Sequence, residues 1–268
     1  MVALNNEKLG GMPQNGAVSG PTVKTVSVPS VEEVMESARG LPFTKLMLKE
    51  KVETATAGQR RFLHSLFEEE TKVRTIAKRV RLTRQANFPA VKTLEGYDWQ
   101  SIIWPQDFGK TQLEALEFID RNENLVLYGD VGTGKTHLAI ALGYAACQAG
   151  IPAKFWTAAS LVAFLRNAQN NGRLEKELTN IARHELIIID ELGYLPIDSH
   201  GARLLFQVIA DAYENRSVIY TSNLEFSRWG QVFGDDQMAA AIIDRTVHHG
   251  RMIKFKGGSY RVANATMK

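Results

Sequence analysis

A glycine-rich turn between two apolar runs carries the residue types that grip phosphate. Residues 125–142, LVLYGDVGTGKTHLAIAL, fit the pattern G-x-x-x-x-G-K-[ST]. Successive backbone N–H groups of such a turn can point at one anion, and the helix behind it adds its positive dipole end. We predict that a nucleotide contacts one continuous run of residues: Gly129, Asp130, Val131, Gly132, Thr133, Gly134, Lys135, Thr136 and His137.

Two acidic residues end a later apolar strand, LIIIDE, at residues 186–191. In the turn, Lys135 offers a cation to the β- and γ-phosphates of ATP, and the Thr136 hydroxyl is a candidate ligand of Mg²⁺. Asp190 can hold the same Mg²⁺ directly or through water, and Glu191 can orient and polarise the attacking water. The alternative is an acidic pair that caps the following helix. Binding of the phosphate and its Mg²⁺ needs only Asp190 of this pair. The presence of Glu191 beside it therefore favours a protein that hydrolyses the nucleotide.

Three further residues are candidates for the same chemistry. Asn223 ends the buried strand YTSN, where its amide could position water and sense the γ-phosphate, although asparagine after a strand is often a turn residue. Arg245, in IIDRTVHH, could meet the nucleotide of a neighbouring subunit, and an arginine there raises the rate by roughly 10³ to 10⁵. Arg261 is a weaker candidate for a phosphate contact within one subunit. Each arginine could instead be a surface residue paired with an acid such as Asp244.

The elements that must position these residues alternate between strand and helix from about Trp104 onward. Fully apolar strands such as ELIIID are typical of the buried middle of a parallel sheet. We therefore expect an α/β fold, a doubly wound parallel sheet with helices on both faces and ligands at the carboxyl ends of its strands. A helix is expected near 111–122, and MIKFKGGSYRV predicts two short strands around Gly257 and Gly258.

The amino-terminal part has a different composition. Residues 1–30 are rich in Gly, Asn, Pro, Ser and Val and are predicted to be a disordered leader. Residues 31–90 predict a small, basic helical domain, in which Thr56 and Gln59 resemble a capping box and Phe62, Leu66 and Phe67 are expected in the core. Pro89 breaks the helical pattern, and residues 91–268 are predicted to form the nucleotide-binding domain.

Basic residues concentrate in the helical segment. Between Arg60 and Lys92, nine basic and three acidic residues give a charge of +6, so the remainder of the chain sums to −3. Such a surface can neutralise nucleic-acid phosphates without reading sequence, in a strongly salt-dependent way. It could also be a solvated helix face, or it could dock onto an acidic protein. The candidate DNA contacts are Lys72, Arg74, Lys78, Arg79, Arg81 and Arg84.

Several classes of protein and site are disfavoured. The longest apolar run, residues 138–147, is shorter than the roughly 20 residues that cross a bilayer, and the amino terminus lacks a signal-peptide core. A single cysteine, Cys147, excludes an intrachain disulfide, so we expect a cytoplasmic protein without a membrane partner. The adjacent His248 and His249 are expected to end a helix rather than bind metal. The aromatic residues Tyr97, Trp99 and Trp104 could flank an adenine or pack in the core.

These motifs together resemble the IstB-like AAA+ ATPases, helper proteins encoded beside the transposases of insertion sequences. The matching stretches include LVLYGDVGTGKTHLAIALG, LIIIDELGYLP, SVIYTSNLEFSRWGQVFGD, AAAIIDRTVHH and GGSYR, within about residues 40–263. The resemblance implies an AAA+ P-loop domain, ATP hydrolysis, ATP-promoted self-assembly on duplex DNA, and recruitment or stimulation of a transposase.

The resemblance also assigns roles to individual residues. Lys135 and Thr136 belong to the Walker A turn, Asp190 and Glu191 to Walker B, Asn223 is the sensor, and Arg245 matches an inter-subunit arginine finger. The long leader departs from the family pattern, as does Asp130-Val131 in the turn. Because backbone N–H groups bind the phosphate, the second departure should not impair binding.

Two other functions remain open from the sequence. A helicase loader would share this ATPase core but would bind single-stranded DNA and a helicase. A non-hydrolysing, nucleotide-gated scaffold would bind ATP without turnover, and Glu191 with Asn223 argues against it. A small-molecule kinase is disfavoured because no arginine-rich lid for a second phosphate is apparent.

Overall fold

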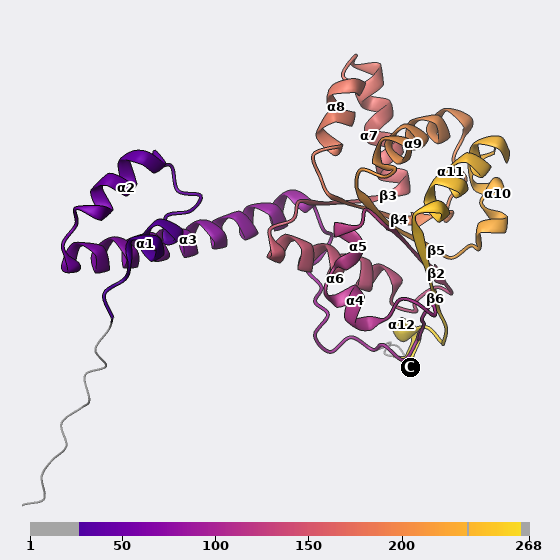
Figure 1. Cartoon of the computed structure of the whole chain (residues 1–268). Coiled ribbons are helices and arrows are strands. Elements are labelled where there is room, and N and C mark those ends of the chain that lie inside the picture. Colours follow the sequence, from indigo (N-terminus) through magenta and orange to yellow (C-terminus); the bar gives the residue numbers. More distant parts are fainter. Residues whose placement is uncertain (1–26, 235, 264–268) are drawn as a thin grey trace, which may run out of the picture. The chain divides into compact units, whose positions relative to one another are not determined.

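The computed structural model describes residues 27–234 and 236–263 of the chain (Figure 1). The predicted leader therefore lies almost entirely outside the described residues. The chain forms two compact units that divide between Thr71 and Lys72. Helix α3 (Ala57–Ala86) contributes to both units. The domain boundary expected near residue 90 stays a prediction, and it falls just after the end of this helix.

The first unit is helical, as expected. It contains α1 (Val31–Ser37), α2 (Lys45–Glu53) and the first part of α3. The predicted capping box is present, because the Thr56 N–H donates to Gln59 Oε1 at 2.8 Å and the Gln59 N–H donates to Thr56 Oγ1 at 3.3 Å. The buried core consists of Val34, Ala38, Leu41, Leu48, Val52 and Phe67.

One aromatic and one aliphatic residue that were expected in this core, Phe62 and Leu66, are on the surface. Phe62 is 65% exposed and Leu66 is 48% exposed, whereas Phe67 is buried and its ring centroid lies 5.3 Å from that of Phe43. A single helix turns only one stripe of side chains toward its neighbours, and this stripe contains Phe67. The expectation for Phe62 and Leu66 is therefore wrong.

The second unit is built on a sheet of six strands in the order β1-β6-β2-β5-β4-β3. Among the described residues, the β1–β6 pair is antiparallel and the other strand pairs are parallel. The strands are β1 (Ile102–Ile103), β2 (Asn124–Gly129), β3 (Ala153–Thr157), β4 (Leu186–Leu192), β5 (Ser217–Ser222) and β6 (Gly250–Phe255). The predicted α/β fold with a doubly wound, mainly parallel sheet is confirmed.

Helices cover both faces of this sheet (Figure 1). In β4, Leu186 and Ile188 pack in one core with α6 (Lys135–Ala149), while Ile187 and Ile189 pack in the other core with α7 (Ala158–Asn170) and α9 (Ser199–Ala212). Side chains of a strand alternate between faces, so a fully apolar strand must be buried on both sides. The remaining helices are α4 (Lys110–Glu114), α5 (Glu117–Asp120), α8 (Leu174–Ile181), η1 (Phe226–Arg228), α10 (Gly230–Phe233), α11 (Asp236–His248) and α12 (Tyr260–Ala263).

Two local predictions differ from the structure. The helix expected near 111–122 is interrupted at Leu116, whose φ of +59° separates α4 from α5. The second of the two carboxyl-terminal strands is instead the short helix α12, which begins at Tyr260. The Tyr260 N–H donates to the Gly132 carbonyl at 3.0 Å, so this segment contacts the distant phosphate turn.

No helix among the described residues is both long and apolar enough to span a membrane.

Candidate nucleotide-binding site

The predicted phosphate turn joins the carboxyl end of β2 to the first residue of α6. Gly129 closes the strand with φ of +145°, and a Cβ there would collide with the backbone carbonyl of Phe255. Gly134 caps α6 with φ of +98°. Residues other than glycine rarely adopt such positive φ angles. Gly129 is therefore required by the close approach of the Phe255 backbone, and Gly134 by its positive φ at the start of α6.

The Lys135 side chain folds back across this turn. Its Nζ donates to the carbonyl oxygens of Gly129 at 2.7 Å and Asp130 at 2.6 Å, and the residue is only 9% exposed. Thr133 Oγ1 also donates to the Asp130 carbonyl, at 2.8 Å. The Lys135 ammonium thus lies beside the backbone that would surround a phosphate. A charged phosphate oxygen is a stronger hydrogen-bond acceptor for this ammonium than the neutral carbonyls are.

Asp190 connects three elements at the carboxyl edge of the sheet. The residue is 3% exposed, and its Oδ1 accepts from the Thr136 hydroxyl at 2.8 Å and from the Thr221 hydroxyl at 2.5 Å. The order β2-β5-β4 brings the three residues together although they are far apart in the sequence. A hydroxyl beside a carboxylate supplies the hard oxygen ligands that Mg²⁺ prefers, so the pair Thr136 and Asp190 fits this ion.

Glu191 leaves the regular strand geometry. Its φ is +60°, and the pairing of β4 with β5 shifts register between Ile189 and Leu192. Its N–H donates to Thr221 Oγ1 at 3.0 Å, while its side chain is exposed and lines a cavity of about 650 Å³ against α7. Bulges next to functional sites redirect a side chain, and here the bulge gives the second acid an exposure that Asp190 lacks.

Thr221 is a candidate site residue that the motifs did not predict. Its hydroxyl accepts from the Glu191 backbone and donates to Asp190, so it links both acidic residues of LIIIDE. The only sequence signal is its place in YTSN, two residues before Asn223. Asn223 itself follows β5, is exposed, and emerges at the same edge of the sheet as the turn and Asp190.

Arg245 lies at the other edge of the sheet. Its backbone carbonyl accepts from Asn124 Nδ2 at 3.5 Å, at the first residue of β2, whereas the phosphate turn begins at the last. The five residue steps of this strand separate these ends by roughly 17 Å. The Arg245 guanidinium lies 4.9 Å from the Phe206 ring centroid and donates to the Ala241 carbonyl at 3.1 Å. Contact with a nucleotide would therefore require a neighbouring subunit, and the arginine-finger role stays a prediction.

Aromatic residues pack against the first turn of α6. The Tyr97 hydroxyl donates to the Gly134 carbonyl at 3.4 Å, and its ring centroid lies 5.3 Å from that of His137 and 4.9 Å from that of Trp99. Burial, with a smaller contribution from Asp98, raises the pKa of Tyr97, so its phenol stays protonated as a donor. Trp104 stacks on Trp99 at 5.9 Å. Packing is thus observed, and contact with an adenine stays a hypothesis.

The carboxyl-terminal segment also reaches the turn. A Cβ on Gly132 would clash with Ser259, and Tyr260 bonds to the Gly132 carbonyl. Arg261 follows directly in α12, although its side chain is outside the described part of the chain. The backbone position is compatible with the predicted phosphate contact, which stays untested.

The predicted DNA contacts lie on the second part of α3. This part is anchored to the second unit by the buried side chains of Leu82 and Ala86 and by a hydrogen bond of 3.3 Å from Gln148 to Thr83. A groove of about 450 Å³, which includes Arg79 and Arg84 in its lining, runs beside it. All six candidate residues are exposed: Lys72, Arg74, Lys78, Arg79, Arg81 and Arg84.

Comparison with known proteins identifies a family that matches most of the chain. The family described as IstB-like ATP binding protein matches residues 43–267. An ATP-binding protein of insertion sequence IS21 from Pseudomonas aeruginosa is 42% identical over 179 residues, which cover 67% of this chain and 68% of that protein. Another, of insertion sequence IS5376 from Geobacillus stearothermophilus, is 40% identical over 201 residues, covering 75% and 80%.

A solved structure shares the fold. AMPPCP-bound DnaA from Aquifex aeolicus superimposes with a TM-score of 0.50 at 18% identity, over 63% of this chain and 52% of that one. The match spans about half of the DnaA chain, and at this identity it shows a shared fold alone.

Proposed function

Because this chain belongs to the IstB-like ATP binding proteins, we propose that it hydrolyses ATP and uses this reaction to assist transposition. ATP binding follows from the family. The observation that carries the hydrolytic part is the placement of two acids of different exposure at one edge of the sheet. Asp190 is buried and bonded to Thr136, whereas Glu191 is exposed beside it.

In the proposed reaction, the backbone N–H groups of residues 129–136 and the Lys135 ammonium bind the β- and γ-phosphates. Thr136 and Asp190 would hold Mg²⁺, which when bound neutralises charge on the phosphate oxygens. The Glu191 carboxylate orients a water and accepts its proton as the water oxygen bonds to the γ-phosphorus. The bond from this phosphorus to the bridging oxygen breaks, which gives ADP and inorganic phosphate. Asn223 would contact the same water.

The proposed substrate of the assembly is duplex DNA, with a transposase as protein partner. The exposed basic residues of α3 support a phosphate-contacting surface, and the insertion-sequence names of the relatives support transposition. ATP-dependent self-assembly along the duplex would repeat this surface at intervals. Deforming a DNA site costs about 1–6 kcal/mol, which an array of such contacts could supply.

The deciding experiment is phosphate release by the purified chain with ATP and Mg²⁺, with and without duplex DNA and the cognate transposase. We expect turnover by the wild type. Glu191→Gln should bind ATP normally and turn over about 10² to 10⁴ times more slowly, because the general base is lost. Glu185→Gln, a change of the same chemistry outside the site, is the matched control and should leave turnover unchanged.

Each outcome assigns a different function. An inactive wild type that still binds ATP and duplex would overturn the ATPase proposal in favour of a nucleotide-gated scaffold. Preferential binding of single-stranded over duplex DNA would favour a helicase loader. A fully active Glu191→Gln variant would remove Glu191 from the proposed reaction.

A further inference from the structure

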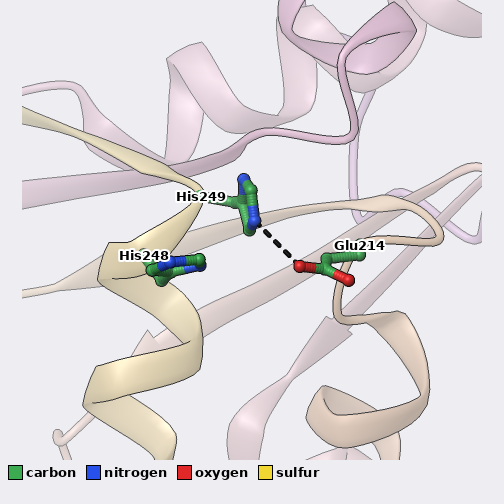
Figure 2. A group of neighbouring side chains, drawn as sticks. All are labelled: Glu214, His248 and His249. Carbon is green, nitrogen blue, oxygen red and sulfur yellow. Dashed lines mark hydrogen bonds and ion pairs between the residues drawn. The ribbon is translucent and has the colours of Figure 1, made fainter.

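A second cluster of metal-ligating residues lies away from the nucleotide site. Glu214, His248 and His249 each offer one ligand atom, and these atoms all lie within 4.8 Å of one another. Figure 2 shows the two imidazoles and the carboxylate converging from the end of α11 and from the turn after α9. The turn before β5 and the junction before β6 are both at the amino-terminal edge of the sheet, opposite the phosphate turn.

The backbone around this cluster is held in place by β2 and the residues before it. The His249 carbonyl accepts from the Asn124 N–H at 2.6 Å, and the Glu214 carbonyl accepts from Asn122 Nδ2 at 3.0 Å. Glu214 has φ of +60°, an uncommon angle for a residue with a side chain. The two chain reversals are therefore tied to one segment, which holds their backbones close together.

The side chains already interact in a way that suits coordination. His249 Nε2 lies 3.0 Å from Glu214 Oε1, and the ring planes of His248 and His249 are perpendicular at a centroid distance of 4.4 Å. His248 Nδ1 lies 2.8 Å from the Tyr213 hydroxyl. When a ring nitrogen donates its proton to such an oxygen, the other nitrogen keeps its lone pair for a metal.

The sequence alone led us to expect no metal at His248 and His249, but the position of Glu214 beside them changes this expectation. We propose that Glu214, His248 and His249 bind a first-row transition-metal ion with the preferences of Zn²⁺. Two imidazoles and one carboxylate form a ligand set that suits this class of ion better than it suits Mg²⁺ or Ca²⁺. Glu214 and His248 are exposed and His249 is half-buried, so an ion can enter and the side chains can close to bond lengths of about 2.0–2.2 Å. Water or a group from another molecule completes the coordination.

Binding would add a metal link between two elements that the contact of Glu214 with His249 already connects. The ion would connect the α9–β5 turn to the α11–β6 junction, and Arg245 lies on the last turns of the same helix. The cluster is separate from Thr136 and Asp190, so its occupancy can be measured without nucleotide. Metal binding and ATP hydrolysis can therefore fail independently.

The test uses the untagged full-length chain, titrated with Zn²⁺ in competition with a chromophoric chelator and, separately, with Co²⁺ followed by its visible d–d absorption. We expect one ion per chain above non-specific binding. His249→Gln and Glu214→Gln should each reduce Zn²⁺ binding to the non-specific level. Tyr213→Phe, which removes the hydroxyl that contacts His248 Nδ1 and Glu214, should weaken binding about 10-fold or more.

His200→Gln is the matched control, because His200 is an exposed histidine whose Nε2 lies 2.7 Å from Gln169 Oε1, outside the cluster. It should bind Zn²⁺ as the wild type does. Unchanged ATP binding by the cluster variants will verify that they are folded. Zn²⁺ affinity that is equal in the wild type and the cluster variants, or a wild type that binds no ion above the non-specific level, overturns the proposal.

Discussion

At the scale of single residues, the candidate site depends on one buried carboxylate. Asp190 is buried and accepts hydrogen bonds from the hydroxyl groups of Thr136 on α6 and Thr221 on β5. Thr221 also accepts from the backbone of Glu191. The same hydroxyl thus positions both members of the acidic pair.

The Lys135→Ala variant should lose ATP binding, with the dissociation constant raised at least about 100-fold, a loss of roughly 2.7 kcal/mol. The reason is that the only cation of the turn itself is removed from the β- and γ-phosphates. Binding of a fluorescent ATP analogue measures the effect. Lys176→Ala, which removes an exposed lysine of α8, is the control and should bind as the wild type does. Tight binding by Lys135→Ala would contradict the assigned role.

Thr221→Val should slow ATP turnover and lower the free energy of unfolding by about 1–3 kcal/mol. Valine has a similar shape but leaves the Glu191 N–H and one bond to Asp190 without the hydroxyl. Urea denaturation and phosphate release measure the two effects. Thr221→Ser, which restores the hydroxyl, should recover most of the turnover. If valine and serine variants turn over ATP equally, Thr221 has no positioning role.

At the scale of elements, α3 combines two tasks along its length. Its early residue Phe67 belongs to the core of the first unit, and its late residues Leu82 and Ala86 belong to a core of the second. The basic residues proposed to contact DNA lie on the part that starts at Lys72. Helical periodicity leaves the remaining faces of this part exposed to solvent.

Charge reversal of Lys78, Arg79 and Arg81 to glutamate should weaken duplex binding at low salt and leave basal ATP hydrolysis unchanged. Each lost phosphate contact should reduce the slope of log affinity against log salt by about 0.9. Fluorescence anisotropy at several salt concentrations measures both quantities. Reversal of Lys45, Lys49 and Lys51 on α2 changes the net charge equally and serves as the control. Equal losses in the two triple variants would indicate a general charge effect rather than a specific surface.

At the scale of the whole molecule, the position of Arg245 bears on assembly. Arg245 and the phosphate turn lie at opposite edges of the sheet. One subunit therefore cannot bring them together, whereas two subunits in a head-to-tail array can. This geometry supports the proposal that the active unit is an oligomer formed on DNA.

Arg245→Ala should bind ATP normally but turn it over roughly 10³-fold more slowly in the assembled state. Mixing this variant with Lys135→Ala should restore part of the activity, because some interfaces then combine an intact turn with an intact arginine. Phosphate release by the mixture, compared with each variant alone, measures this effect. Absence of rescue in mixtures shown to co-assemble on duplex would remove Arg245 from the role of trans-acting arginine.

The sequence by itself determined the parts of this protein that local spacing controls. The fixed glycines, Lys135 and Thr136 lie within eight consecutive residues, so strand, turn and helix follow one another without help from the rest of the chain. The apolar strand before Asp190 predicted a sheet buried on both faces for the same reason. The family resemblance, carried by motifs of this kind, is confirmed as well.

Only the tertiary structure decided which distant segments meet. Thr221 reaches Asp190, Tyr260 reaches the phosphate turn, and Glu214 reaches His249 through pairings that depend on strand order and chain reversals. The carboxyl-terminal segment, expected to contain a second strand, is a short helix whose first residue contacts Gly132. Side-chain periodicity reports which face of an element is buried, but the partner on that face is set by the packing of the whole unit.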